Sequence, residues 1–600
     1  MFNMKWDGLA IGLCLAVAST AAAQEVTLSA PGAKDGLEDF LSSASIAVSL
    51  AEEGDKSPQD FIAAARADYR SLLTALYAKG YYAGAISIRV DGREASAIPP
   101  LDAPGRIGRI AITVDPGPRF TFGAARIAPL PEGARPPDAF ASGEVALSDT
   151  IRQAAVEGVE AWRAAGHAKA DVADQQIVAR HAAEQLDASV TLSPGPRLTF
   201  GPLTVVGNED VRTAALLNIA GLPVGETFSP EELARAAKRL RDTGAFDSVA
   251  MTEAEAVGPN NTLPITVTVA EAKPRRIGAG IELSSVEGLK LSTYWMHRNA
   301  FGAAERFRIE GEVAGLGGGT GGIDYRIATS LTIPAIYGPD LDIVAKAGIS
   351  REDEPDYLLD KAEVELGLSR AITDDLTVSG GVGYLAAREE TAAGTREYTL
   401  VTLPLQATFD RRDNPTDARN GYYVDVRATP FYGLNGSDSG GRLYVDTRGY
   451  VSFGTDDRIT LAARGQIGSV IGADRDQAPV DFLFFSGGSG SVRGQPYKAL
   501  GIDEVIGGEE VTTGGASFAG AQLEARYGIT ESIGLVGFYD VGYVGATETP
   551  LEDGAWHSGL GIGARYNTGI GPIRFDIGTP ANGDDAFGSV QVYIGIGQAF

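Results

Sequence analysis

The stretch Ala362-Glu363-Val364-Glu365-Leu366-Gly367-Leu368 carries apolar side chains at every second position, and Glu363 and Glu365 stand between them. Successive side chains of a β-strand point to opposite faces, so this spacing predicts a strand with one apolar and one polar face. The same alternation recurs near residues 289–293, 307–311, 424–428 and 459–465. We therefore expect the second half of the chain to consist of strands.

Counting the alternating runs over residues 274–600 indicates about 16 strands, and tilted membrane strands need about 9–11 residues each. Long strands with an apolar outer face and a polar inner face are typical of a membrane barrel. We predict a 16-stranded antiparallel transmembrane β-barrel over 274–600. A soluble β-sandwich or propeller also alternates, but the strand lengths and the terminal run 592–600, which ends on Phe600, favour the barrel.

Composition limits the class of protein. The chain has 600 residues, 78 of them acidic and 51 basic, a net charge of -27 and a mean hydropathy of -0.03. Several domains are expected at this length. Nucleic acid is an unfavourable partner, because phosphate contacts need clustered Lys and Arg. Beyond the N-terminus no apolar run approaches the roughly 20 residues of a spanning helix, which excludes a helical membrane protein.

Residues 1–23 have the organisation of a secretory signal peptide. Lys5 supplies the positive charge, residues 9–18 form a short apolar core, and Ala21-Ala22-Ala23 precedes the predicted cleavage site. The single cysteine, Cys14, lies in this segment. Its removal leaves a mature chain without thiols, which excludes thiol catalysis and is typical of the periplasm or the outer membrane.

The first half of the chain contains a repeat. Residues 116–123 read Pro-Gly-Pro-Arg-Phe-Thr-Phe-Gly, and residues 194–201 repeat them with Leu for one Phe. Predicted strands flank both copies, and predicted helices end at Gly80, Gly166 and Gly244, where glycine can adopt the left-handed conformation. We predict three α+β units of β-α-α-β-β order, at 24–115, 116–195 and 196–273.

The longest predicted loop lies between Val470 and Ala516 and contains Arg493 within residues 490–497. A guanidinium inside a barrel needs acceptors, because an unpaired buried charge is strongly destabilising. The next strands offer Glu524 and Asp540. The alternative is that Arg493 is an exposed loop charge without a partner.

Together these features resemble a known family. The three units are similar to POTRA domains, and the barrel is similar to that of the Omp85 superfamily, or bacterial surface antigens, whose long sixth loop carries a Val/Ile-Arg-Gly-aromatic tip. Val492, Arg493 and Gly494 match that tip; Gln495 replaces the aromatic residue, and Tyr497 follows two positions later. Residues 409–415, 419–423 and 571–576 resemble further motifs of the same barrels. Three POTRA units are typical of the TamA branch, whereas BamA usually has five and two-partner secretion transporters two.

The resemblance implies a site and a moving part. In the family, the loop arginine contacts an acidic strand residue and a Phe-x-Asp-x-Gly strand, which correspond here to Glu524 and to Phe538, Asp540 and Gly542. The first strand (277–284) and the last strand (589–600) are expected to form a lateral seam that opens to admit nascent hairpins into lipid. The residues assigned to this seam are Ile277, Ile281, Ile594, Ile596 and Phe600.

The implied function is that of an outer-membrane insertase or translocation factor of a Gram-negative bacterium, with periplasmic POTRA units that pair with substrate strands by β-augmentation. The implied partners are the lipid bilayer, nascent β-barrel or autotransporter substrates, and an inner-membrane-anchored partner of the TamB type. One alternative is a two-partner-secretion-type transporter of an unfolded exoprotein. Another is a passive porin, which the POTRA repeats disfavour.

Enzymatic patterns are missing from the sequence. His167, His181, His297 and His557 have no partner at metal-binding spacing, and no G-x-S-x-G motif occurs. Residues 559–564 imitate a dinucleotide-binding loop, but they lie in a Gly-rich alternating run and do not open a helix. We expect no enzymatic activity, no cofactor and no metal ion.

Overall fold

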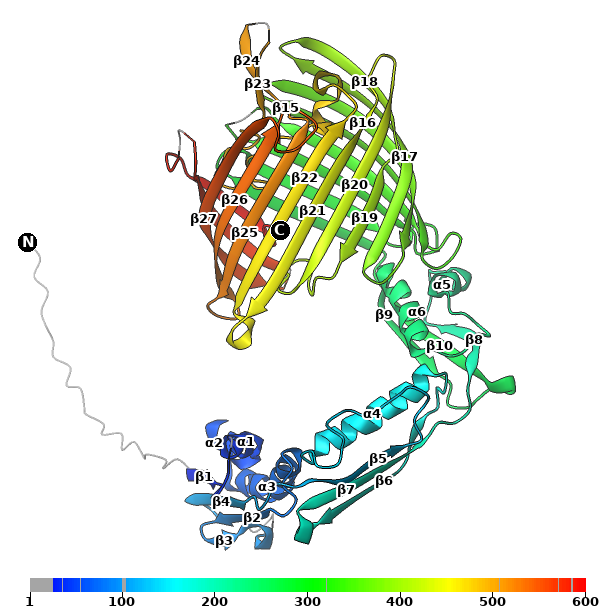
Figure 1. Cartoon of the computed structure of the whole chain (residues 1–600), viewed down its shortest axis with the longest axis vertical. Coiled ribbons are helices and arrows are strands. Elements are labelled where there is room, and N and C mark those ends of the chain that lie inside the picture. Colours follow the sequence, from blue (N-terminus) through cyan, green and yellow to red (C-terminus); the bar gives the residue numbers. More distant parts are fainter. Residues whose placement is uncertain are drawn as a thin grey trace, which may run out of the picture. The chain divides into compact units, whose positions relative to one another are not determined.

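The structure is a computed structural model that describes residues 25–34, 36–53, 56–99, 104–319, 321–506, 508–569, 571–583 and 586–600. The predicted signal peptide, including Cys14, lies outside these residues. The chain divides into two compact units near Thr199; the first contains two α+β sheets, and the second contains a third sheet and the barrel (Figure 1). Within the described ranges, no helix is both long and apolar enough to cross a membrane.

The first α+β sheet has the strand order β1-β4-β2-β3, with β1 parallel to β4. Helix α3 begins with a capping box, in which Ser57 and Asp60 each accept from the other's backbone N–H. Its Leu72 is fully buried with Ile88 and Ile110 of the sheet. The elements are β1 (Glu25–Ser29), α1 (Leu37–Ala44), α2 (Ile46–Glu53), α3 (Pro58–Ala78), β2 (Ala85–Val90), β3 (Arg93–Glu94) and β4 (Arg109–Asp115).

The second and third sheets share one topology, in which the last strand of each lies between the other two. The second unit has one helix where the predicted order has two. Its first connection is rich in proline (Pro129, Pro131, Pro136 and Pro137), which opposes helix formation. The elements are β5 (Thr121–Ala128), α4 (Ser148–Ala164), β6 (Asp171–Arg180) and β7 (Gln185–Ser193), then β8 (Thr199–Val206), α5 (Thr213–Ala220), α6 (Pro230–Asp242), β9 (Phe246–Glu253) and β10 (Thr262–Glu271).

The helix ends are confirmed. Gly80, Gly166 and Gly244 follow α3, α4 and α6, and all three have positive φ (85°, 97° and 69°). A side chain at these positions would be strained, so glycine allows each helix to turn sharply into the next segment.

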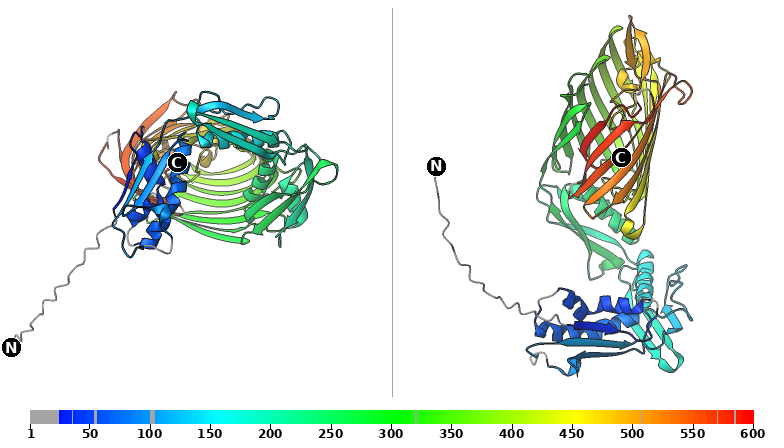
Figure 2. Two further views of the ribbon diagram at one scale, coloured as in Figure 1. Left: turned by 90° about the horizontal axis from the view of Figure 1, so that it is seen from below. Right: turned by 90° about the vertical axis from the view of Figure 1, so that its left-hand side faces the viewer.

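The predicted barrel is also confirmed: the described strands β11–β22 and β25–β29 form one closed antiparallel barrel (Figures 1 and 2). Strands β18 and β19 both pair with β17 and β20 and are one strand interrupted at Leu403 and Pro404, because proline has no N–H for the ladder. Counted in this way, the barrel described here has sixteen strands. They are β11 (Arg275–Ser284), β12 (Gly288–His297), β13 (Arg306–Leu316), β14 (Asp324–Ile333), β15 (Leu341–Glu354), β16 (Tyr357–Ala371), β17 (Leu376–Thr391), β18 (Gly394–Thr402) with β19 (Leu405–Asp410), β20 (Gly421–Leu434), β21 (Gly440–Phe453), β22 (Ile459–Ile471), β25 (Ser517–Gly528), β26 (Ile533–Gly545), β27 (Gly554–Thr568), β28 (Gly571–Pro580) and β29 (Gln591–Ile596).

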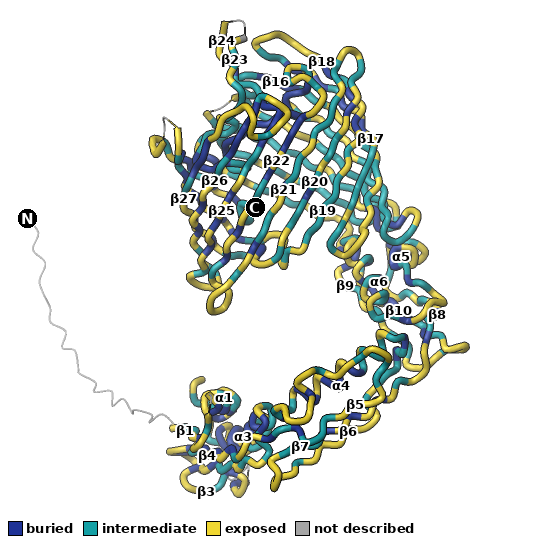
Figure 3. The backbone as a smooth tube through the Cα atoms, viewed as in Figure 1, coloured by how far each residue is buried: buried dark blue, intermediate teal, exposed yellow. Residues whose placement is uncertain are grey.

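The two faces of the barrel differ as the alternation predicts. Apolar residues that point outward are exposed; Leu366 and Leu523, for example, have 62% and 55% of their surface accessible. Inward residues of β22 and β25–β28 are mostly buried, whereas those of β12–β15 are mostly half-buried (Figure 3). The outer face therefore offers an apolar surface of the kind that lipid covers, and the interior is filled mainly along one wall.

Candidate functional site

The filled wall is covered by the long loop between β22 and β25, the eleventh and twelfth strands of the described barrel. Early in the loop, Val480 and Phe482 are buried in an apolar cluster with Leu359, Leu385 and Leu400 of the barrel wall. Later in the loop, a hairpin of β23 (Ile502–Ile506) and β24 (Glu509–Thr513) returns the chain to β25. The segment between these two parts, residues 486–498, is called the loop tip below.

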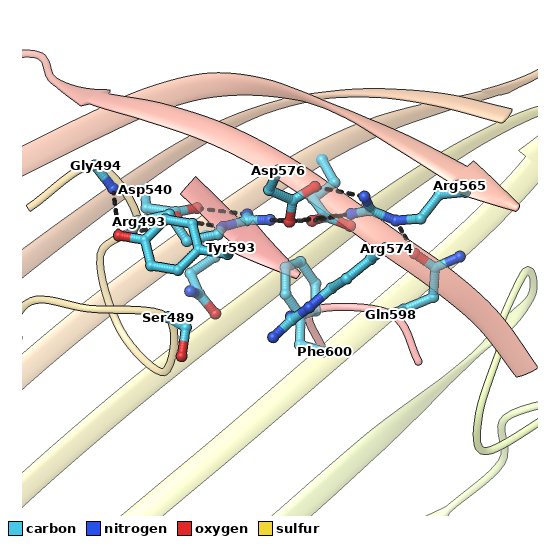
Figure 4. A network of polar contacts seen from close by, with 12 residues as sticks. Ser489, Arg493, Gly494, Asp540, Arg565, Arg574, Asp576, Tyr593, Gln598 and Phe600 are labelled. Atoms are coloured by element: carbon cyan, nitrogen blue, oxygen red, sulfur yellow. Dashed lines mark hydrogen bonds and ion pairs between the residues drawn. The ribbon is translucent and has the colours of Figure 1, made fainter. Parts of the chain in front are cut away.

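The loop tip places Arg493 inside the barrel with no exposed surface (Figure 4). The Asp540 carboxylate on β26 accepts from Arg493 Nε (2.8 Å), Nη2 (3.0 Å) and the backbone N–H (3.1 Å). Glu524 on β25 accepts from Nη1 at 2.6 Å, and the Phe538 ring lies 3.8 Å from the guanidinium carbon. The structure thus brings Arg493 together with Glu524, Phe538 and Asp540, and the reading of Arg493 as a free surface charge is wrong.

Three further charged residues complete the site. Asp576 on β28 accepts from Arg493 Nη1 at 3.4 Å and also pairs with Arg565 on β27, while Arg526 donates to Glu524 at 2.8 Å. The group is thus three guanidinium and three carboxylate groups, each residue at most 8% exposed. Equal numbers of opposite charges make this burial tolerable, because each ion has a partner. Sequence reasoning missed Asp576, Arg526 and Arg565, although their inward positions follow from the strand alternation.

The residues around Arg493 adapt the loop tip to the wall. Gly494 has φ 92°, and a Cβ there would lie 2.5 Å from the carbonyl oxygen of Thr579; its N–H donates to the Tyr593 hydroxyl at 3.1 Å. Val492 is fully buried, and a Cβ on Gly542 would lie 2.8 Å from its side chain. Glycine at both positions therefore allows the loop tip to approach the wall closely.

Two positions near the tip differ from the family pattern. Gln495, in place of an aromatic residue, donates to the backbone carbonyl of Ser558 on β27 at 2.8 Å. Tyr497 does not contact Arg493; it packs beside Gly488 and Lys498. Lys498 donates to Glu352 (3.2 Å) and Glu354 (2.9 Å), so the loop tip is held at β15 as well as at β25–β28.

The seam between β11 and β29 is short. Its ladder covers only Leu283 opposite Ile594 and Ser284 opposite Tyr593, whereas the β11–β12 ladder covers all of Arg275–Ser284. Ile277 and Ile281 on β11 and Ile596 on β29 face outward, 74%, 63% and 53% exposed. Over most of its length, β11 therefore has no backbone partner on this side.

The placement of Phe600 in the seam is wrong. Strand β29 ends at Ile596, and Gly597 (φ 98°) turns the last residues into the barrel (Figure 4). There Phe600 is buried with Ala418, Tyr450 and Ala462, and its carbonyl oxygen accepts from Arg526 at 3.2 Å. The turn ends β29 at Ile596 and so leaves the first part of β11 without an opposing strand, while the ladder itself already stops at Ile594.

A separate groove lies in the first compact unit, between α4 and the edge strand β6. It encloses about 1010 Å³, and Ile151, Val159 and Ile177 are among the residues that line it. Strand β6 pairs only with β7 in the described sheet, so its other edge is free. Burial raises the pKa of Tyr82, at one end of the groove, to about 12, so its hydroxyl remains a donor at neutral pH.

Comparisons with known proteins agree with this architecture. A family profile described as "Omp85 superfamily domain" matches residues 299–600, and one described as "Surface antigen variable number repeat", a POTRA profile, matches residues 198–272. Outer membrane protein assembly factor BamA of Neorickettsia risticii (strain Illinois) is 23% identical over 406 residues, which cover 62% of this chain. The match spans about half of that relative, 51% of its length.

Solved structures show the same fold. BamA from Haemophilus ducreyi lacking POTRA domains 1-3 superposes with a TM-score of 0.60 at 14% identity, covering 80% of this chain and all of that one. CdiB from Acinetobacter baumannii superposes with a TM-score of 0.52 at 12% identity, covering 80% of this chain and 89% of that one. At these identities the likeness concerns the fold and not the activity.

Proposed function

Because the chain belongs to the Omp85 superfamily and is an outer-membrane β-barrel with periplasmic POTRA domains, we propose that it assists the insertion of β-barrel proteins or autotransporters into the outer membrane. The role needs no catalytic group, cofactor or metal ion. It needs a wall that can open sideways and a periplasmic surface that receives extended chains.

The short seam is the observation that carries this proposal. Parting β11 from β29 breaks a ladder of two residue pairs and the adjoining hydrogen bonds of Ser285 to Val592 and Gln591, while every other strand keeps its own partners. A typical hydrogen bond contributes only about 1 kcal/mol net to folding, but unpaired backbone groups in lipid cost several kcal/mol each. Opening is therefore inexpensive only when an incoming strand pairs with the freed edges.

Locking the seam tests the proposal. Leu283→Cys and Ile594→Cys place thiols at directly opposed positions, where Cα atoms of antiparallel strands are about 4.5–5.5 Å apart, within the range of a disulfide. The one native cysteine, Cys14, lies in the predicted signal peptide. We expect oxidation to lower assembly of a reporter barrel at least tenfold and reduction to restore it. Full assembly by the oxidised protein would refute the proposal.

The α4–β6 groove is the proposed entry point for substrate, by β-augmentation on the free edge of β6. A photoreactive residue at Ile177, which lines the groove, is expected to crosslink to an unfolded barrel-protein chain. The same residue at Val178 is the matched control, because neighbouring side chains of a strand point to opposite faces and both positions are about half exposed (48% and 55%). Equal crosslinking at both positions would contradict binding in the groove.

Within the superfamily we propose that the chain belongs to the TamA branch, because its three POTRA-like units are the number typical of that branch. This finer assignment includes an inner-membrane-anchored partner of the TamB type. A pull-down from membranes with the chain's first 273 residues as bait, with and without the first unit, tests for such a partner.

The second candidate function is two-partner-secretion-type export of an unfolded protein through the lumen, and the fold shared with CdiB is compatible with it. The two functions differ in their sensitivity to crosslinks. A short thiol crosslinker between Ser491→Cys and Gln522→Cys fixes the loop tip to the wall, because the Gln522 side-chain amide donates to the backbone carbonyl of Ser491 at 2.7 Å. Export through the lumen should stop with that lock and survive the seam lock.

A further inference from the structure

A lumen-side ion pair crosses the seam where its backbone ladder has ended. Arg574 lies on β28 and Glu282 on β11, with β29 between them, yet Arg574 Nη2 donates to Glu282 Oε1 at 2.9 Å. Arg574 is 8% exposed, so most of its side chain is packed inside the barrel and not in free solvent. The pair thus connects the two sides of the seam without using the backbone of β29.

The register explains how the arginine reaches across a whole strand. Arg574 is directly opposite Gly595 in the β28–β29 ladder. Continuing the β11–β29 register by one step beyond Leu283 and Ile594 sets Gly595 opposite Glu282. The three residues therefore form one row across three strands, and the central member has no side chain.

Gly595 is the residue that leaves this path open. A Cβ at Gly595 would lie 3.3 Å from Arg574 Nε, slightly closer than ordinary contact, and 3.6 Å from Nη2, at ordinary contact distance. Its φ is not positive, so the backbone itself does not require glycine there. The need for glycine comes instead from the guanidinium that lies over it.

The neighbouring lysine does not compete with Arg574 for the carboxylate of Glu282. Lys290 is opposite Glu282 in the β11–β12 ladder, but it pairs with Glu312 at 2.8 Å. The same oxygen of Glu282 also accepts from the hydroxyl of Ser489 in the loop tip at 3.4 Å. One carboxylate on the first strand thus joins β28 and the loop tip.

We propose that Arg574, Gly595 and Glu282 form a latch that holds the seam closed from the lumen side and that is shared with the loop tip through Ser489. The latch rests on the proposed function, in which the seam opens. When the loop tip moves away from the wall, Glu282 loses the hydrogen bond from Ser489 and keeps only the one from Arg574. Movement of the loop and opening of the seam are therefore coupled at Glu282.

The test measures seam closure in the full-length protein without any substrate. Ile281→Cys and Ile596→Cys, the next outward pair beyond the ladder, report closure through their rate of disulfide formation. Arg574→Met should slow this rate about threefold, the range of a partly exposed ion pair. Gly595→Leu should slow it similarly, although it removes no charge. The charge exchange Glu282→Arg with Arg574→Glu should restore the rate.

Arg351→Met is the control for loss of a cross-strand arginine pair, because Arg351 pairs with Asp360 (2.6 Å) between β15 and β16, away from the seam and with 48% of its side chain exposed. Heat-dependent gel migration identifies variants that fail to fold. If Arg574→Met does not fold, the disulfide rates of the charge exchange and of Gly595→Leu decide whether the latch exists. Equal rates in the parent, Arg574→Met and Gly595→Leu, or no rescue by the exchange, would overturn the latch. Since no substrate is present, this result is independent of whether the seam lock blocks assembly.

Discussion

Arg493→Ala is expected to detach the loop tip and to lower the free energy of unfolding of the barrel by about 3–5 kcal/mol. The change leaves Glu524, Asp540 and Asp576 facing two guanidinium groups in place of three, with no surface exposure to relieve the imbalance. It also removes the two hydrogen bonds that Asp540 accepts from the Arg493 side chain and the one that Glu524 accepts, whereas the backbone N–H that donates to Asp540 is retained. Arg493→Lys keeps the charge but not the planar fork, so an intermediate loss is expected.

Urea unfolding in detergent, followed by heat-dependent gel migration, measures this effect. The yield of the short thiol crosslink between Ser491→Cys and Gln522→Cys reports the loop position and should fall in Arg493→Ala. The control is Arg475→Ala in the same loop; Arg475 pairs with Glu504 but keeps 20% of its side chain exposed, so a loss within about 1 kcal/mol is expected. If Arg493→Ala and Arg475→Ala lose equal stability, the buried charge group does not hold the loop.

Gly494→Ala is expected to have nearly as large an effect, a loss of about 2–4 kcal/mol, although it adds only a methyl group. The backbone at Gly494 has φ 92°, which is strained for any L side chain, and the new Cβ would lie 2.5 Å from the Thr579 carbonyl oxygen. The carbonyl belongs to β28, so the barrel wall cannot move aside. The loop tip must withdraw instead, and Arg493 would leave its carboxylates with it.

Gly490→Ala is a matched control four residues earlier, since a Cβ there meets no atom within 4 Å and φ is not positive. A change within about 0.5 kcal/mol is expected for it. The same unfolding and crosslinking measurements apply to both variants. Wild-type crosslinking in Gly494→Ala would show that the loop tip tolerates a side chain at this position, against the geometry described here.

The alternation of apolar and polar residues was sufficient to predict the barrel, its sixteen strands and the loop between the eleventh and twelfth. The reason is that side-chain direction along a strand is a local property. Glu524 and Asp540 could be named as partners of Arg493 because they are acidic residues on the strands after the loop, and the resemblance to the Omp85 superfamily implied the same two positions. The helix ends at Gly80, Gly166 and Gly244 are equally local.

Only the tertiary structure showed which charged residues surround Arg493, where the last residues of the chain lie, and that Arg574 pairs with Glu282. Asp576, Arg526 and Arg565 were readable as inward-facing, but which of them meet depends on the stagger between neighbouring strands. Phe600 continues an apolar pattern in the sequence, yet the turn at Gly597 and the pocket beside Tyr450 draw it into the barrel. Arg574 and Glu282 are nearly 300 residues apart, and the row that joins them exists only because closure of the barrel sets the register between its first and last strands.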